Sequence, residues 1–245
     1  MKERLDKYIS SQTELSRKEA QKAIRDKRVC VNGGLIRAVD YKTDTETDTV
    51  TLDGQALSFK KHVYYMLYKP AGVVSATEDR TERTVLDLLP PEMQRSGLFP
   101  AGRLDKDTTG LLILTDDGDY AHRMLSPKKH VVKRYIATLD REPDESVTES
   151  FRGGITLGDG TVCKSGQAEL LGENRVAVEI SEGKYHQVKR MFAALGYHVE
   201  ALERVRIGAL ELDLSLRAGE VRELSEKEAD RVFEPYTDNR HCEAL

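Results

Sequence analysis

The chain has 245 residues, 33% of them charged and 39% hydrophobic, and its formal net charge is −4. This length suits one large domain or two smaller ones, and the composition is that of a soluble globular protein. No apolar run approaches the roughly eighteen residues of a membrane-spanning helix, and the opening MKERLDKY lacks a signal-peptide core, so we expect a cytoplasmic protein with no membrane contact.

The cysteines and histidines do not indicate a disulfide framework or a metal site. Cys30, Cys163 and Cys242 are widely separated, and the six histidines form no HxxxH or Cys/His cluster. The sequence therefore predicts no metal. The net negative charge argues against a nucleic acid as partner, unless basic side chains gather locally on the surface.

Residues 1–57 are predicted to form a small separate domain. Ser16 and Glu19 have the spacing of a capping box, which marks the start of a helix. Between positions 15 and 28, two acidic residues stand against six basic ones, namely Arg17, Lys18, Lys22, Arg25, Lys27 and Arg28. A solvated helix face is the simpler interpretation of such a stripe taken alone.

Two turn signals follow in the same domain. One strand runs into Asn32-Gly33 and a later one into Asp53-Gly54, dipeptides that favour tight hairpin turns. Beyond them lie a polar linker, a larger domain and a polar end. The predicted boundaries are 1–57 for the small domain, 58–62 for the linker, 63–233 for the larger domain and 234–245 for a mobile tail.

The larger domain begins with a predicted strand over residues 63–68, which Lys69-Pro70 ends. Tyr64 and Tyr65 are neighbours on this strand. Because successive side chains point to opposite faces, we expect one ring in the core and the other at the surface. An exposed tyrosine there would offer a stacking platform for a base.

A single carboxylate, Asp105, stands between a turn and a core strand. It follows Arg103, and the turn at residues 108–110 leads into the apolar run 111–114, which has the length and residue types of a strand. Such neighbours hold an acid rigidly, as a catalytic carboxylate must be held. From local features alone, a turn-capping role is the simpler interpretation.

The rest of the chain alternates between short strands and a few helices. Val188, Met191, Phe192 and Leu195 have helical spacing, and Gly196 marks the end of that helix. This alternation predicts the α+β class, with a mixed, mainly antiparallel sheet flanked by helices. The other predicted elements are helices over 84–89, 119–125, 144–151 and from Ser225, and strands over 135–139, 175–180 and within 200–216.

Four stretches of the larger domain closely resemble the RsuA-type pseudouridine synthases. They are KPAG at 69–72, GRLD at 102–105, Lys133-x-Tyr135, and EGKYHQVKRMFAALG at 182–196. The last has the form typical of the branch that modifies small-subunit ribosomal RNA. The resemblance implies that Asp105 is the essential catalytic residue, that Tyr135 lines the active site, and that Lys189 pairs with Asp105.

The small domain resembles the alpha-L RNA-binding domain of a small-subunit ribosomal protein. The similar stretches are RLDKYIS at 4–10, LSRKEAQKAIRDKRVCVNG at 15–33 and DTVTLDG at 48–54. The resemblance implies that basic side chains hold structured RNA through phosphate and groove-shape contacts. The RNA-binding residues that we expect are Arg17, Lys18, Lys22, Arg25 and Arg28 in this domain and Arg103 and Lys133 in the larger one.

The implied reaction breaks the bond between ribose C1′ and uracil N1 of a uridine and rejoins the base through C5, without a cofactor. Asp105 is the implied nucleophile, which either adds to C1′ or drives a route through a glycal. Burial favours the neutral form of a carboxyl group, so Lys189 is expected to keep Asp105 ionised. Tyr135 would stack on the uracil, and Arg103 would help to fill the place of the everted base.

The form of the stretch at 182–196 favours 16S rRNA as the substrate, either free or within a partly assembled small subunit, and we expect a monomer. Three alternatives stay open. They are a 23S rRNA synthase of the same family, a non-catalytic RNA-binding factor of ribosome assembly, and a glycosidase that would use Asp107 or Asp116 as its second carboxylate.

Overall fold

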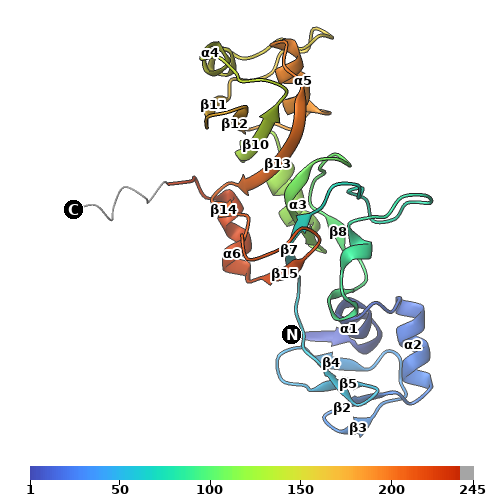
Figure 1. Ribbon diagram of the computed structural model, residues 1–245. Coiled ribbons are helices and arrows are strands. Elements are labelled where there is room, and N and C mark those ends of the chain that lie inside the picture. The colour runs from blue at the N-terminus through green and yellow to red at the C-terminus, as the bar shows by residue number, and fades with distance from the viewer. Residues whose placement is uncertain (238–245) are drawn as a thin grey trace. The chain divides into compact units, whose positions relative to one another are not determined.

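The computed structural model describes residues 1–237, which divide into two compact units (Figure 1). The first unit contains Met1–Val63 and Leu89–Phe99, and the second contains Tyr64–Leu88 and the chain from Pro100 onward. The segment Leu89–Phe99, which the sequence assigned to the larger domain, therefore groups with the smaller one. Its backbone is tied there, since the N–H of Ser96 donates to the carbonyl of Thr13 at 2.9 Å.

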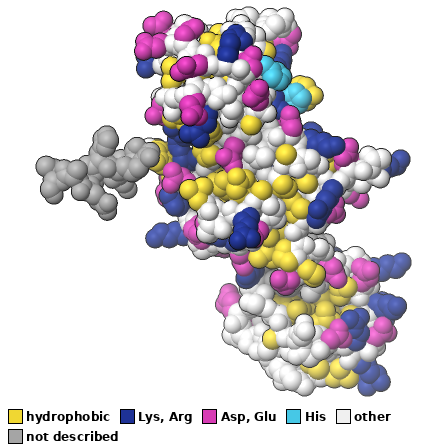
Figure 2. All heavy atoms as spheres, viewed as in Figure 1, with side chains coloured by type: hydrophobic (Ala, Val, Ile, Leu, Met, Phe, Trp, Pro, Cys, Tyr) yellow, Lys and Arg dark blue, Asp and Glu magenta, His cyan; other side chains and the backbone are white. Residues whose placement is uncertain are grey.

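Charges of both signs are interspersed over the surface. On the face in Figure 2, lysines and arginines lie among aspartates and glutamates. No helix of residues 1–237 has the length and apolar character needed to cross a membrane. Within the same residues, no three His, Cys, Asp or Glu side chains are grouped so that they could hold a metal ion.

The first unit packs two helices against short antiparallel strands. Its sheets have the strand orders β3-β2-β5-β6 and β1-β4. The buried core includes Leu5, Tyr8 and Ile9 of the first helix and Ala23 and Ile24 of the second. The elements are β1 (Lys2–Arg4), α1 (Leu5–Gln12), α2 (Arg17–Arg25), β2 (Val29–Val31), β3 (Gly34–Leu35), β4 (Lys42–Asp44), β5 (Val50–Leu52), β6 (Gln55–Leu57) and the 3₁₀ helix η2 (Pro91–Met93).

The local signals of this unit are confirmed. Ser16 caps α2, and the reciprocal bond from Glu19 completes the capping box. The hairpin turns have the left-handed backbone that their sequences favour, with φ of 52° at Asn32 and 78° at Gly33 in one of them.

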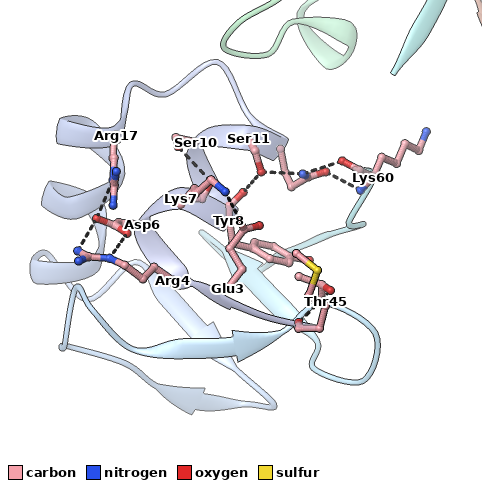
Figure 3. Close-up of polar contacts among 12 residues, drawn as sticks. Glu3, Arg4, Asp6, Lys7, Tyr8, Ser10, Ser11, Arg17, Thr45 and Lys60 are labelled. Atoms are coloured by element: carbon pink, nitrogen blue, oxygen red, sulfur yellow. Dashed lines mark hydrogen bonds and ion pairs between the residues drawn. The ribbon is translucent and has the colours of Figure 1, made fainter. Parts of the chain in front are cut away.

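Asp6 joins α1 to α2. Its fully buried carboxylate accepts hydrogen bonds from Arg4 at 3.0 Å and Arg17 at 3.2 Å (Figure 3). It also accepts one from the Gln21 amide at 2.7 Å. Burial alone raises the pKa of Asp6, but the three hydrogen bonds outweigh it and lower the pKa to about 2. Asp6 is therefore ionised at neutral pH and holds Arg17 against the surface of the unit.

The second unit is built on a nine-stranded sheet. Seven strands follow the order β11-β12-β10-β13-β9-β7-β15, β14 adds beside β13, and β8 adds beside β9. Strands β13 and β9 run parallel, while the pairs on either side of them are antiparallel. The predicted α+β class with a mixed, mainly antiparallel sheet is confirmed. The strands are β7 (Tyr64–Lys69), β8 (Phe99–Pro100), β9 (Thr109–Thr115), β10 (Lys133–Leu139), β11 (Gln167–Leu170), β12 (Arg175–Ile180), β13 (Val199–Ile207), β14 (Leu210–Glu211) and β15 (Val221–Leu224).

Helices gather at two places along this sheet (Figure 1). Phe151 and Phe192 join α4 to α5, with their ring centroids 5.3 Å apart. Tyr120 joins α3 to α6, since its hydroxyl donates to the carbonyl of Ala229 at 2.8 Å. The helices are α3 (Gly118–Leu125), α4 (Ser146–Gly153), α5 (Gln187–Ala194) and α6 (Glu226–Asp230), with the 3₁₀ helices η1 (Leu86–Leu88) and η3 (Arg231–Phe233).

The prediction that one of Tyr64 and Tyr65 lies at the surface is wrong. Both are buried, because β7 is an inner strand of the sheet and is covered on both faces. The Tyr64 hydroxyl donates to Asp117 at 2.7 Å, and its ring lies 4.8 Å from that of Tyr120. Neither tyrosine is available as a stacking platform.

Candidate active site

The loop that carries Asp105 is fastened to the end of β7. The buried ammonium group of Lys69 donates to three backbone carbonyls, those of Pro70 at 2.9 Å, Lys106 at 3.2 Å and Thr108 at 2.9 Å. Burial lowers the pKa of Lys69 to about 8, so the ammonium form with its three N–H donors predominates at pH 7. On the other side of Asp105, the Ser75 hydroxyl donates to the carbonyl of Leu104 at 2.9 Å and accepts from its N–H at 3.0 Å.

Behind this loop, Gly110 lets two strands approach closely. Its φ is +104°, and a Cβ there would lie 2.2 Å from the carbonyl oxygen of Arg204 on β13. Only glycine fits such a contact. The parallel pairing of β9 with β13 thus depends on the Thr-Gly dipeptide that follows Asp105 in the sequence.

Lys189 lies close to two aspartates of the loop that carries Asp105. From the first turn of α5, its Nζ lies 3.7 Å from Oδ2 of Asp105 and 2.5 Å from Oδ1 of Asp107. The hydrogen bond from Lys189 lowers the pKa of Asp107. Nε2 of His186 lies 3.5 Å from Oδ1 of Asp105. Asp105 thus has two nitrogen groups close to it, one on each carboxylate oxygen.

A small cavity lies at this carboxylate. Its volume is about 90 Å³, and Asp105, Tyr135, Arg103 and His186 are among its lining residues. The Asp105 side chain is 28% exposed, so it is partly shielded but accessible to a ligand. Tyr135, on β10, is buried and forms a wall of the cavity, while Arg103 is exposed at its edge. The structure therefore brings together four of the residues that the sequence singled out, namely Asp105, Tyr135, Lys189 and Arg103.

Lys133 does not lie with the exposed basic residues. It is 9% exposed on β10, and burial, aided by the nearby Arg204, lowers its pKa to about 8. A phosphate contact requires an accessible cation, so we leave Lys133 out of the proposed RNA contacts. The sequence held a sign of this burial, because residues two apart on a strand share a face and Lys133 is two residues from Tyr135.

The five predicted RNA-binding residues of the first unit are all exposed, but they differ in their partners. Arg17 is held by Asp6, and Arg28 forms a two-pronged pair with Asp53 at 2.8 and 2.5 Å. Within residues 1–237, Lys18, Lys22 and Arg25 form no ion pair. These three cations are therefore available on one helix, α2, for an anionic partner.

Three contributors to the site were not predicted from the sequence. Asp107 shares Lys189, His186 approaches Asp105, and Ser75 fixes Leu104. His186 stands in the stretch at 182–196 that carried the family resemblance. Ser75 gave no local signal, and Asp107 was considered only as a second carboxylate of a glycosidase. Their contacts join segments that only the folded sheet brings together.

The comparison with protein families decides the class of this site. The RNA pseudouridylate synthase model matches residues 63–194, more than half of the chain. The chain belongs to this family. The S4 domain model matches residues 3–49, so an RNA-binding module precedes the synthase domain.

Relatives of this pseudouridine synthase span nearly its whole length. It is 44% identical over 232 residues to "Ribosomal small subunit pseudouridine synthase A" of Escherichia coli (strain K12), covering 94% of this chain and 99% of the relative. It is 42% identical to the uncharacterized RNA pseudouridine synthase YtzG of Bacillus subtilis (strain 168), covering 95% and 99%. A crystal structure of a pseudouridylate synthase matches with a TM-score of 0.66 and 40% identity, covering 94% and 99%.

Family membership settles the choice between the broad alternatives. The chain is an isomerase that acts on uridine in RNA, which excludes the glycosidase and the non-catalytic assembly factor. The arrangement suits that chemistry, because a partly shielded carboxylate beside a cation can stabilise positive charge on a ribose.

Proposed function

We propose that this enzyme converts a specific uridine of 16S rRNA to pseudouridine, with Asp105 as the nucleophile. The substrate is supported by the 44% identity to a relative named for the ribosomal small subunit. The role of Asp105 is supported by one observation above the others. Its carboxylate lies 3.7 Å from Lys189 on a cavity walled by Tyr135, where a flipped base can meet it.

In the proposed reaction, the bond from C1′ to N1 breaks while the Asp105 carboxylate stabilises the positive charge that develops on the ribose. Both addition to C1′ and the route through a glycal begin at a carboxylate in this place. The freed uracil turns against the Tyr135 ring and forms a bond from C5 to C1′. The proton on C5 then leaves with the help of Tyr135, and N1 takes up a proton.

The proposal assigns separate tasks to RNA binding and chemistry. Arg17, Lys18, Lys22, Arg25 and Arg28 hold the RNA through its phosphates. Arg103, exposed at the edge of the cavity, helps to fill the place that the everted base leaves.

The test uses unmodified transcripts of 16S and 23S rRNA, free and partly assembled with ribosomal proteins. After incubation, pseudouridine is mapped by carbodiimide labelling and primer extension. We expect one modified position in 16S rRNA with the wild-type protein and none with Asp105→Asn, while Asp105→Asn still binds the RNA. Pseudouridine formed by Asp105→Asn would contradict the role of Asp105 as nucleophile. Pseudouridine formed only in 23S rRNA would show that the large-subunit RNA is the substrate instead.

A further inference from the structure

A tyrosine is presented to solvent beside the Asp105 cavity. Tyr185 is 76% exposed, yet its ring is fixed in place by stacking on His186, with 3.8 Å between the ring centroids and an interplanar angle of 19°. His186 lines the cavity and approaches Asp105 at 3.5 Å. The stacked rings therefore extend from the cavity at Asp105 toward solvent. The face of the Tyr185 ring that does not contact His186 is open.

The segment that carries these rings is held by polar contacts. Glu182 accepts from the backbone N–H of Lys164 at 3.0 Å, from the Gln187 amide at 2.7 Å and from the Lys184 ammonium at 2.8 Å. The carbonyl of Tyr185 accepts from Arg190 at 3.4 Å. These bonds fix the backbone on both sides of the exposed ring, which is thus oriented before any ligand arrives.

The backbone conformation of His186 is a further sign of a binding surface at this segment. Its φ is 47°, a left-handed conformation that is unfavourable for a residue other than glycine. This conformation occurs directly before α5 and turns the two rings onto one another. A strained residue next to a reactive carboxylate and an exposed ring indicates a binding surface, because the interior of the unit gains no packing from Tyr185.

We propose that the Tyr185–His186 pair is a stacking site for the base of a nucleotide adjacent to the target uridine. The inference rests on the proposed function. The target base itself belongs in the cavity, against Tyr135, and Tyr185 lies outside the set of residues that line it. Aromatic rings stack on any base, and the exposed Arg103 at the cavity edge is placed for the phosphate of the same strand. An unpaired neighbour of the everted uridine is the ligand that fits this surface.

Kinetics with the full-length protein and a 16S rRNA transcript test the site. Tyr185→Ala should raise KM about tenfold, the size of one lost base–aromatic stack, and leave kcat nearly unchanged. Tyr185→Phe should behave as the wild type, because a stack needs the ring and not the hydroxyl group. Leu214→Ala, which removes another side chain that is 87% exposed, is the matched control. An unchanged KM for Tyr185→Ala, or a loss with Tyr185→Phe as large as with Tyr185→Ala, overturns the inference.

Fluorescence separates this inference from the proposed function. The chain contains no tryptophan, so Tyr185→Trp introduces a single indole, here combined with Asp105→Asn to prevent turnover. Saturation with the 16S rRNA transcript should quench this indole strongly and leave that of Leu214→Trp unchanged. Absence of quenching at saturating RNA overturns the stacking site. If the wild type forms no pseudouridine in either rRNA, the proposed function fails, and the quenching still decides whether Tyr185 stacks on a base.

Discussion

Lys189 is shared between two carboxylates of unequal burial. Asp107 lies nearer to its Nζ, at 2.5 Å, but is 74% exposed, whereas Asp105 lies at 3.7 Å and is 28% exposed. Exposed ion pairs contribute little, because water screens them. We therefore expect the pair with the more shielded Asp105 to matter more for the reaction than the shorter pair with Asp107.

Lys189→Met should lower kcat about 30-fold, which corresponds to a loss of about 2 kcal/mol of transition-state stabilisation. The reason is that the Asp105 carboxylate then lacks the cation that lies 3.7 Å from it. Single-turnover kinetics at saturating RNA measure this effect, and Lys189→Arg, which keeps the charge, should retain more activity. Equal losses with methionine and arginine would contradict an electrostatic role.

Asp107→Asn is the matched comparison. The pair that it removes is largely exposed and worth less than about 1 kcal/mol, so kcat should change by less than about fivefold. The same single-turnover assay applies. A loss as large as that of Lys189→Met would show that Asp107 takes part in the chemistry itself.

Individual residues show where sequence reasoning reaches its limit. The motifs predicted that Asp105 and Lys189 pair, and their side chains do lie at ion-pair distance. The sharing of Lys189 with Asp107 depends on where a loop and a helix end meet, and no local pattern encodes that meeting. The prediction that one of Tyr64 and Tyr65 is exposed was wrong for a related reason. Strand alternation predicts the face of the sheet on which a side chain lies, but not whether that face is covered.

Among the elements, the loop before β9 depends on a single buried lysine. Lys69→Met keeps the length of the side chain but leaves three backbone carbonyls without their donor. We expect a loss of about 3 kcal/mol in the free energy of unfolding, and a fall in kcat that exceeds the rise in KM, because Asp105 is no longer held in place. Denaturant unfolding and steady-state kinetics measure the two effects.

Lys106→Met serves as the control for this variant. Lys106 stands in the same loop, but its side chain is 51% exposed and pairs with Glu82 at the surface. Its replacement should change the free energy of unfolding by less than about 1 kcal/mol. Similar losses for the two variants would mean that burial of Lys69 has no special role.

The junction of α1 with α2 should be sensitive to acid. The pKa of Asp6 is about 2 in the folded protein against 3.8 as the reference, so its ionised form stabilises the fold. This contribution is complete above about pH 4 and is lost as the pH falls through 2. Asp6→Asn should lower stability by about 2 kcal/mol at pH 6, and the difference from the wild type should shrink toward pH 2. Hydrogen exchange of the α1 and α2 amides measures it, and a difference independent of pH would contradict the assignment.

Elements with a local cause were predicted well. The capping box of α2 and the Asn-Gly turn were correct because a few adjacent residues determine them. The helix expected over 84–89 is only the 3₁₀ turn Leu86–Leu88. The parallel pairing of β13 with β9 was beyond reach, since it joins residues more than ninety positions apart through a contact at Gly110.

At the scale of the whole molecule, an acidic protein binds a polyanion through a local group of cations. With a net charge of −4, we expect attraction to RNA to come from exposed residues such as Lys18, Lys22 and Arg25 on α2. Each phosphate contact adds to the salt dependence of binding.

Replacing Lys18, Lys22 and Arg25 together by alanine should therefore reduce the slope of log Kobs against log salt by about 2 to 3. Filter binding of the 16S transcript at several salt concentrations gives this slope. Lys227→Ala, an exposed lysine on α6, should leave it unchanged. An unaltered slope for the triple variant would show that α2 does not contact the phosphates.

Because Leu89–Phe99 belongs to the first unit, the polypeptide passes from one unit to the other three times, after residues 63, 88 and 99. The first unit is therefore made of two separate segments of the chain, Met1–Val63 and Leu89–Phe99. A break after residue 63 would separate the rest of the first unit from Leu89–Phe99, the segment whose Ser96 N–H donates to the carbonyl of Thr13. Replacement of residues 1–63 by another RNA-binding module would therefore leave Leu89–Phe99 without the residues that it bonds.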